Sequence, residues 1–188
     1  MRTSILLAAL TIAGCGGPGV NSNADAKTAY LGLDASVDKA IQLGFDGFNA
    51  PSTGANIQPQ MTTGTKSGTL TITGIVDQGS SANKNMTLSE AMVMYSDDGK
   101  ITYDTMTTAQ PVLTVSLKGI PTGTFSGSLD GAFDMKGALT GTVTLALTFT
   151  GNLQPGTNGA TVDRQPGSTH IVGTATSGNG VYQVDVTR

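Results

Sequence analysis

The chain has 188 residues, a formal net charge of −3 and only 12% charged residues. Its Lys and Arg residues form no cluster, so the composition argues against a nucleic-acid-binding surface and gives no support for a patch that binds anionic lipid. A chain of this length can bury the core of one domain without disulfides or a metal ion.

The first residues combine one positive charge, Arg2, with a short apolar run over residues 5–13 and small residues after it. This arrangement is typical of a secretory signal peptide. The run is too short to cross a bilayer as a helix, which takes about 20 apolar residues. The glycines and the proline at positions 16–19 also prevent the run from continuing as a helix.

Residues 12–15, Ile-Ala-Gly-Cys, resemble the lipobox of bacterial lipoproteins. The resemblance covers residues 1–17 only, and we recognise no family in the rest of the chain. It implies that Cys15, the only cysteine, carries a diacylglyceryl group on its sulfur and, after cleavage before it, a further acyl chain such as palmitate on its amine. Two or three such chains hold a protein stably on a membrane, whereas one chain binds marginally. The alternative is an ordinary secretory peptide with an incidental cysteine.

The same resemblance implies where the mature protein resides. In the sorting pattern of enteric bacteria, Asp directly after the lipidated cysteine retains a lipoprotein in the inner membrane, and here that residue is Gly16. We therefore expect a lipid-anchored protein of the bacterial cell envelope, at the outer membrane, facing the periplasm or the cell surface. The expected organisation is a signal peptide over residues 1–14, a flexible tether over 15–24 and a single β-rich domain over 25–188.

One helix is predicted near residues 25–45, because apolar residues recur there at spacings of three and four. Asn23 or Asp25 is expected to cap its start, and Gly44 or Gly47 its end. We expect the apolar stripe to close the end of a barrel or to cover a curved sheet, and a helix that lies on a membrane surface is the alternative. The stripe consists of Tyr30, Leu33, Val37, Ile41 and Phe45 or Phe48.

Between residues 113 and 153 the apolar side chains occupy odd-numbered positions, and the even positions hold mostly Thr, Ser, Asp, Lys and Ala. A period of two is the signature of β-strands with one buried face. The apolar odd positions are Leu113, Val115, Leu117, Phe125, Leu129, Phe133, Met135, Leu139, Val143, Leu145, Leu147, Phe149 and Leu153.

Turns must interrupt this long segment without changing its parity, which requires loops with an odd number of residues. Residues 120–123 and 134–137 suit three-residue hairpin loops that end in a glycine bulge. Gly131 is therefore expected inside a strand. Two shorter hairpins are predicted at residues 98–99 and 178–179. The first would pair Ser96 with Ile101 and Met94 with Tyr103, and the second would pair Ala175 with Tyr182, Gly173 with Val184 and Ile171 with Val186.

The predicted fold is mainly β, an antiparallel meander of about eight strands that closes into a small barrel or a strongly curved sheet, with one N-terminal α-helix packed on it. An open sandwich is the second choice. A barrel that spans the membrane would need aromatic girdles, which five Phe, four Tyr and no Trp do not provide. Residues 49–67 and 154–167 are expected to be loops. The predicted strands are 68–76, 86–96, 100–107, 111–120, 123–134, 137–152, 168–177 and 180–187.

Few side chains suit catalysis or metal binding. His170 is the only histidine and Glu90 the only glutamate, and neither belongs to a recognisable catalytic motif. His170 alternates with Ile171, so we expect it to face solvent. Asp97 and Asp98 precede a glycine as in a turn, without the alternating ligands of a calcium loop. We predict no catalytic residue, no metal site and no cofactor, and Cys15 is the only site residue that the sequence identifies.

Two functions remain open at this stage. One is a non-enzymatic structural or interaction module, whose partner is an envelope protein. The other is a carrier that holds a hydrophobic small molecule in the concavity of the sheet, with methionines lining it. A packed interior favours the first function and a large apolar pocket favours the second. The methionines in question are Met86, Met92, Met94, Met106 and Met135.

Overall fold

A computed structural model describes residues 18–50, 56–77, 81–157 and 159–188. In this part of the chain two helices, α1 (Asn23–Leu31) and α2 (Asp34–Asn49), precede ten strands. The strands are β1 (Asn56–Thr63), β2 (Ser67–Val76), β3 (Lys84–Ser96), β4 (Ile101–Asp104), β5 (Val112–Lys118), β6 (Thr124–Gly137), β7 (Gly141–Pro155), β8 (Val162–Arg164), β9 (His170–Ser177) and β10 (Gly180–Thr187).

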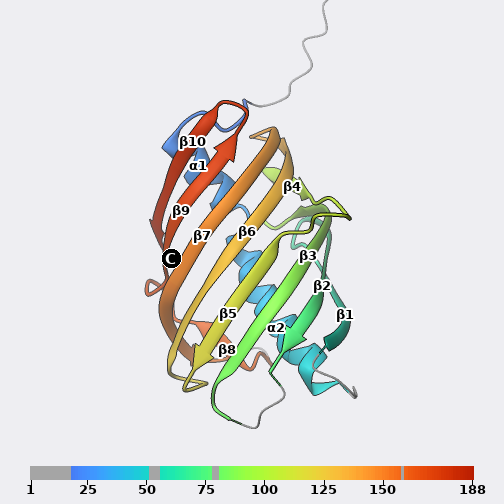
Figure 1. Cartoon of the computed structure of the whole chain (residues 1–188), viewed down its shortest axis with the longest axis vertical. Coiled ribbons are helices and arrows are strands. Elements are labelled where there is room, and N and C mark those ends of the chain that lie inside the picture. The colour runs from blue at the N-terminus through green and yellow to red at the C-terminus, as the bar shows by residue number, and fades with distance from the viewer. Residues whose placement is uncertain (1–17, 51–55, 78–80, 158) are drawn as a thin grey trace, which may run out of the picture.

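The strands form one antiparallel sheet in the order β1-β2-β3-β4-β6-β7-β9-β10. Strands β4 and β5 lie one after the other between β3 and β6, and each pairs with both. These four strands are therefore joined in a closed ring of hydrogen-bonded pairs. Strand β8 pairs with the end of β7. Figure 1 shows the long, strongly curved sheet that results, with the helices behind it. The predicted mainly β, antiparallel architecture is confirmed.

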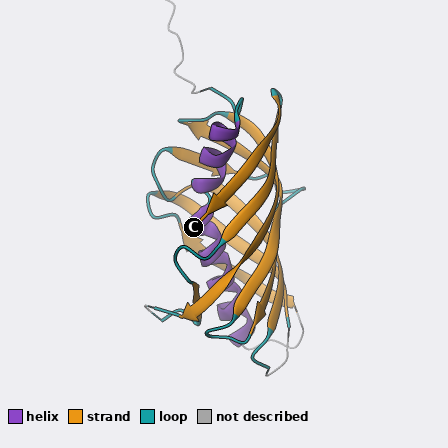
Figure 2. Cartoon of the chain, turned by 90° about the vertical axis from the view of Figure 1, so that its left-hand side faces the viewer, coloured by secondary structure: helices purple, strands orange, loops and turns teal. Residues whose placement is uncertain are grey.

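Both helices lie along the concave face of the sheet, as Figure 2 shows from the side. Helix α2 contacts β1, β2 and β3, and α1 contacts β10, so the helices reach both edge strands of the sheet. The core therefore lies between the helices and the inner face of the sheet. Neither helix of the described chain is long and apolar enough to cross a membrane. The residues of the helices and of the break between them that enter this core are Ala26, Ala29, Tyr30, Leu33, Val37, Ala40, Ile41, Leu43 and Phe45.

The predicted helix over 25–45 is present as two helices, with a break at Gly32 and Leu33. Gly32 ends α1, and a Cβ there would collide with the hydroxyl of Tyr103, which donates a hydrogen bond to the carbonyl of Ala29 at 2.8 Å. The start of α1 is capped by Ser22 and not by Asn23 or Asp25 as predicted, because Oγ of Ser22 accepts the N–H of Asp25 at 3.1 Å.

The expectation that Gly44 or Gly47 ends the helix is wrong, because both lie inside α2. They let the helix approach the sheet closely instead. A Cβ at Gly44 would lie 2.7 Å from the sulfur of Met86, and one at Gly47 would lie 2.8 Å from Cβ of Ile57. The lack of a side chain at these two glycines therefore allows α2 to pack closely on the sheet and does not end the helix.

The parity prediction for residues 113–153 is confirmed, because every apolar odd-numbered residue named above is at most 4% exposed. The hairpin at residues 178–179 is also confirmed: Ala175 pairs with Tyr182, Gly173 with Val184 and Ile171 with Val186. Gly131 lies inside β6, as predicted.

The hairpin at residues 98–99 differs from the prediction by one residue in register. Tyr95, and not Met94, pairs with Tyr103. This shift arises in the turn itself, over residues 97–100. A separate irregularity in β3 at Val93 and Met94 adds one residue relative to β2; both side chains are exposed there and Met94 has a φ of 47°. The extra residue reverses the alternation, so Tyr95 faces the core and Met94 faces solvent.

Three other boundaries differ from the prediction. A turn was expected at residues 134–137, but strand β6 continues through them because β4 pairs with it there. The loop between β6 and β7 is formed by residues 138–140 instead. The loop predicted over 49–67 contains β1, and the one over 154–167 contains β8. Neither strand has a clear period of two: β1 carries Pro59 and β8 has three residues.

The predicted flexible tether also requires a correction for residues 18–24. Val20 is 1% exposed, its carbonyl accepts the hydroxyl of Ser177 at 2.7 Å, and Pro18 accepts the N–H of Thr140 at 3.2 Å. Residues 18–24 are therefore bound to the ends of β9 and β7 or form the start of α1. The signal peptide, Cys15 and residues 16–17 lie outside the described residues.

Candidate functional site

The two residues considered for catalysis lie on opposite faces of the sheet. His170 is exposed on β9, as predicted, with Nε2 2.9 Å from Oδ1 of Asp185 on the neighbouring strand. Glu90 points inward from β3 and is 0% exposed. The structure therefore does not bring them together, and the exposed His170–Asp185 contact is a surface pair.

Glu90 is an exception in an otherwise apolar region of the core. Neither of its carboxyl oxygens has a hydrogen-bond partner among the described residues, although its backbone N–H donates to the carbonyl of Pro111 at 2.9 Å. Burial raises the pKa of Glu90 to about 8. The side chain is thus mostly a neutral acid at pH 7, a state in which it costs the fold far less than a buried charge would.

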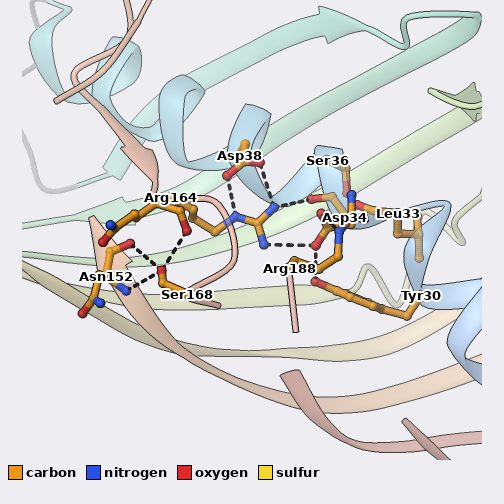
Figure 3. Close-up of polar contacts among 10 residues, drawn as sticks. Tyr30, Leu33, Asp34, Ser36, Asp38, Asn152, Arg164, Ser168 and Arg188 are labelled. Atoms are coloured by element: carbon orange, nitrogen blue, oxygen red, sulfur yellow. Dashed lines mark hydrogen bonds and ion pairs between the residues drawn. The ribbon is translucent and has the colours of Figure 1, made fainter. Parts of the chain in front are cut away.

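The strongest polar cluster joins α2 to the short strand β8 (Figure 3). Arg164 of β8 donates from Nε and Nη2 to the two carboxylate oxygens of Asp38, at 2.6 and 2.7 Å. It also donates from Nη1 to the carboxylate of Asp34 at 3.0 Å and from Nη2 to the backbone carbonyl of Asp34 at 2.9 Å. One guanidinium therefore binds two successive turns of the same helix, in the forked geometry that arginine favours.

Asp34 is the centre of this cluster and its side chain is only 7% exposed. It accepts the hydroxyl of Tyr30 at 2.6 Å and Nε of Arg188 at 3.1 Å in addition to Arg164. Burial by itself would raise the pKa of Asp34, but the charge of Arg164 and the hydrogen bonds outweigh burial and hold that pKa below its usual range. Burial and the neighbouring Asp34 raise the pKa of the Tyr30 hydroxyl. Asp34 is thus an ion that three partners stabilise.

A recess of about 330 Å³ lies beside this cluster. It is lined by Asp34, Asp38 and Arg164, by Arg188, and by the loop after β8, including Gln165 and Thr169. Its two carboxylates and two guanidinium groups balance in charge and already bind one another. Such a recess can admit water or a small polar molecule, and Thr169 in its lining has a buried hydroxyl with no hydrogen-bond partner among the described residues. The clearest role of the Arg164 cluster is to hold α2 against the sheet.

Sequence reasoning missed this cluster. The one local signal is that Asp34 and Asp38 are four residues apart and so share a helix face. Arg164 lies well over a hundred residues further along the chain, in a segment predicted to be a loop, so no spacing rule connects it to them.

The five methionines divide between the core and the surface. Met86, Met92 and Met135 are at most 2% exposed and fill the core, whereas Met94 is 59% and Met106 is 51% exposed. They therefore do not line one common cavity.

The acidic turn at residues 97–98 has a structural role, as its sequence predicted. Asp98 accepts the backbone N–H groups of Lys100 and Ile101, at 2.7 and 3.2 Å. Asp97 accepts Nζ of Lys39 at 2.5 Å and so holds α2 to the end of β3. Within the described ranges no group of three or more His, Cys, Asp and Glu residues has the geometry to hold a metal ion.

Comparisons with known proteins do not assign the chain to a family. No protein-family model matches it, and no curated protein or solved structure shows significant similarity to it.

The Arg164 cluster makes a prediction about stability. Arg164→Gln leaves two carboxylates without their main partner, one of them buried, and should lower the free energy of unfolding by about 3–5 kcal/mol. Urea denaturation at pH 7 measures this loss. The control is Lys136→Gln, which removes an ion pair whose lysine side chain is 70% exposed and should cost less than about 1 kcal/mol. Equal, small losses in both variants would show that the cluster does not hold the helix.

Buried Glu90 makes a prediction about pH. Its pKa is about 8 in the folded protein against an ordinary value of 4.5, so between these values the folded state retains a proton that the unfolded chain releases. The free energy of unfolding should therefore fall by several kcal/mol as the pH rises from 4.5 to 8. Glu90→Gln should abolish this fall and be the more stable protein at pH 8, as urea denaturation across that range would measure.

Asp130→Asn is the matched control for Glu90→Gln, because Asp130 is an exposed carboxylate on the neighbouring part of the sheet. Its pH profile should follow that of the unmodified protein. A Glu90→Gln profile that also coincides with the unmodified one would mean that Glu90 is not buried in the folded protein.

Proposed function

We propose that this chain is a lipoprotein of the bacterial cell envelope, anchored through lipid on Cys15, whose domain is a non-enzymatic structural or interaction module. The lipobox resemblance of residues 12–15 supports the anchor. The residue Gly16 after it favours the outer membrane. The domain then works at a membrane surface, where its partner is another component of the envelope.

The observation that carries the proposal for the domain is the packed interior of the sheet. The side chains that would line a ligand cavity instead contact one another and the two helices in one continuous core. Each of them is at most 2% exposed, and they include the three Phe residues of β6 and β7. These side chains are Phe125, Leu129, Phe133, Leu145, Leu147 and Phe149.

A hydrophobic carrier is the alternative that this packing disfavours. A binding site for a lipid-like molecule would need several hundred cubic ångströms of apolar space. The concave face that would offer this space is covered by α1 and α2, and the 330 Å³ recess beside Arg164 has four charged side chains in its lining. A ligand could enter the concavity only if the helices left it.

The non-enzymatic character is supported by the separation of His170 from Glu90. Nucleophilic or acid–base catalysis needs its groups within hydrogen-bonding reach of one another or of one substrate. Here one group is exposed on the outer face and the other is buried in the core.

Native mass spectrometry of the full-length protein, expressed in a bacterium and extracted in mild detergent, tests both parts of the proposal. The polypeptide should begin at Cys15 and carry the covalent mass of a diacylglyceryl group and an acyl chain. The Cys15→Ser variant should carry no covalent lipid. Neither protein should retain a stoichiometric non-covalent lipid, because the helices occupy the concavity.

The two possible failures of this experiment are distinct. Covalent lipid on the Cys15→Ser variant, or none on the unmodified protein, would contradict the anchor. A non-covalent lipid retained in equal amount by both proteins would support the carrier in place of the packed module.

A further inference from the structure

The point where the proposed anchor joins the domain is defined by the contacts of residues 18–20. The carbonyl of Pro18 accepts the N–H of Thr140 in the β6–β7 loop at 3.2 Å. The carbonyl of Val20 accepts the hydroxyl of Ser177 at 2.7 Å and the amide of Asn179 at 3.2 Å, both at the β9–β10 turn. The chain therefore enters the domain between these two loops, at the upper end of the sheet in Figure 1.

Very little chain separates Cys15 from this end. Three residues along the backbone reach at most about 11 Å, even when fully extended. The opposite end of the sheet, at the β5–β6 loop, is on the order of 45 Å away, because β6 alone has 14 residues. A lipid on Cys15 thus restricts the β6–β7 and β9–β10 loops far more than any other part of the domain.

The chemistry of the two loops suits close approach to a bilayer. Residues 138–141 are Ala, Leu, Thr and Gly, and residues 177–180 are Ser, Gly, Asn and Gly, so neither loop carries a charge. Charged residues lie beside the first of these loops and not in it: the carbonyl of Lys100 accepts the N–H of Ala138 at 2.9 Å, and Lys136 precedes the loop on β6. Farther from these loops, the outer face of the sheet exposes carboxylates such as Asp130 and Asp185, which an anionic membrane repels.

We infer that the end of the domain formed by the β6–β7 and β9–β10 loops is its membrane-facing surface, held against lipid headgroups by the short link from Cys15 to Pro18. The inference rests on the proposed lipid anchor. It orients the domain with the sheet rising from the bilayer, so that the β5–β6 loop is directed away from the membrane, toward partners.

Fluorescence quenching in vesicles tests this orientation. The full-length lipidated protein is reconstituted into vesicles of phosphatidylethanolamine and phosphatidylglycerol that contain a lipid with a nitroxide on its headgroup. A fluorophore is attached to Gly178→Cys in the β9–β10 turn, where a side chain would meet no atom within 4 Å. The matched variant is Thr122→Cys, an exposed position in the β5–β6 loop. Quenching should be several-fold stronger at position 178 than at position 122.

A longer link provides a second comparison. Insertion of 20 Gly and Ser residues between Gly17 and Pro18 allows a mean separation of about 25 Å between lipid and domain. The strong quenching at position 178 should then fall toward the level at position 122.

The outcomes separate this inference from the anchor on which it rests. Lipidated protein with equal quenching at both positions, or with stronger quenching at position 122, would overturn the orientation alone. A sample whose intact mass shows no lipid on Cys15 would overturn the anchor, and the orientation with it.

Discussion

The contact between the helical pair and the concave face of the sheet is the interaction on which the rest of the structure depends. The sheet has one apolar face over its whole length, and that face must be buried for the chain to fold. A sheet this long does not pair its first strand with its last among the described residues, so it cannot bury the face by closure alone. Helices α1 and α2 supply the missing surface and reach both edge strands, β1 and β10.

The closeness of this contact explains otherwise unfavourable residues in the helices. Glycine inside a helix costs roughly 0.5–1 kcal/mol relative to alanine. Gly44 and Gly47 nevertheless lie in α2, where they admit Met86 and Ile57 of the sheet, and Gly32 ends α1 where it admits the hydroxyl of Tyr103. At the two glycines inside α2, close packing across the layers outweighs the helix propensity of a single residue.

Polar groups inside the molecule set the position of the helices more than they add to stability. In the ion pairs between Arg164 and the carboxylates of α2, the attraction between the charges only offsets the free energy lost when they leave water. Well-packed apolar side chains could therefore replace them with little net loss of stability. Their geometry, however, allows only one rotation and one depth of α2 relative to β8. Glu90 provides no such constraint, because its carboxyl has no partner in the described core.

Most of the sheet could be predicted because a period of two depends only on neighbouring residues. The odd positions from Leu113 to Leu153 and the register at Gly178 follow from that rule and from turn chemistry. The extra residue at Met94 could not be predicted, since a bulge reverses the alternation without a local sequence signal. Strand β1, with Pro59 in it, and β8, with three residues, form only because neighbouring strands lie beside them. Arg164 was missed for the same reason: its partners are distant in sequence.

The packing of α2 on the inner face of the sheet can be measured directly by solution NMR of the detergent-solubilised full-length protein with labelled methionine methyl groups. The sulfur of Met86 lies 2.7 Å, and its methyl carbon 3.5 Å, from the position of a Cβ on Gly44. We expect a strong nuclear Overhauser effect between the Met86 methyl group and the α-protons of Gly44. A Met86 methyl group that shows no contact with α2 and exchanges magnetisation with bound lipid or detergent would contradict a packed interior.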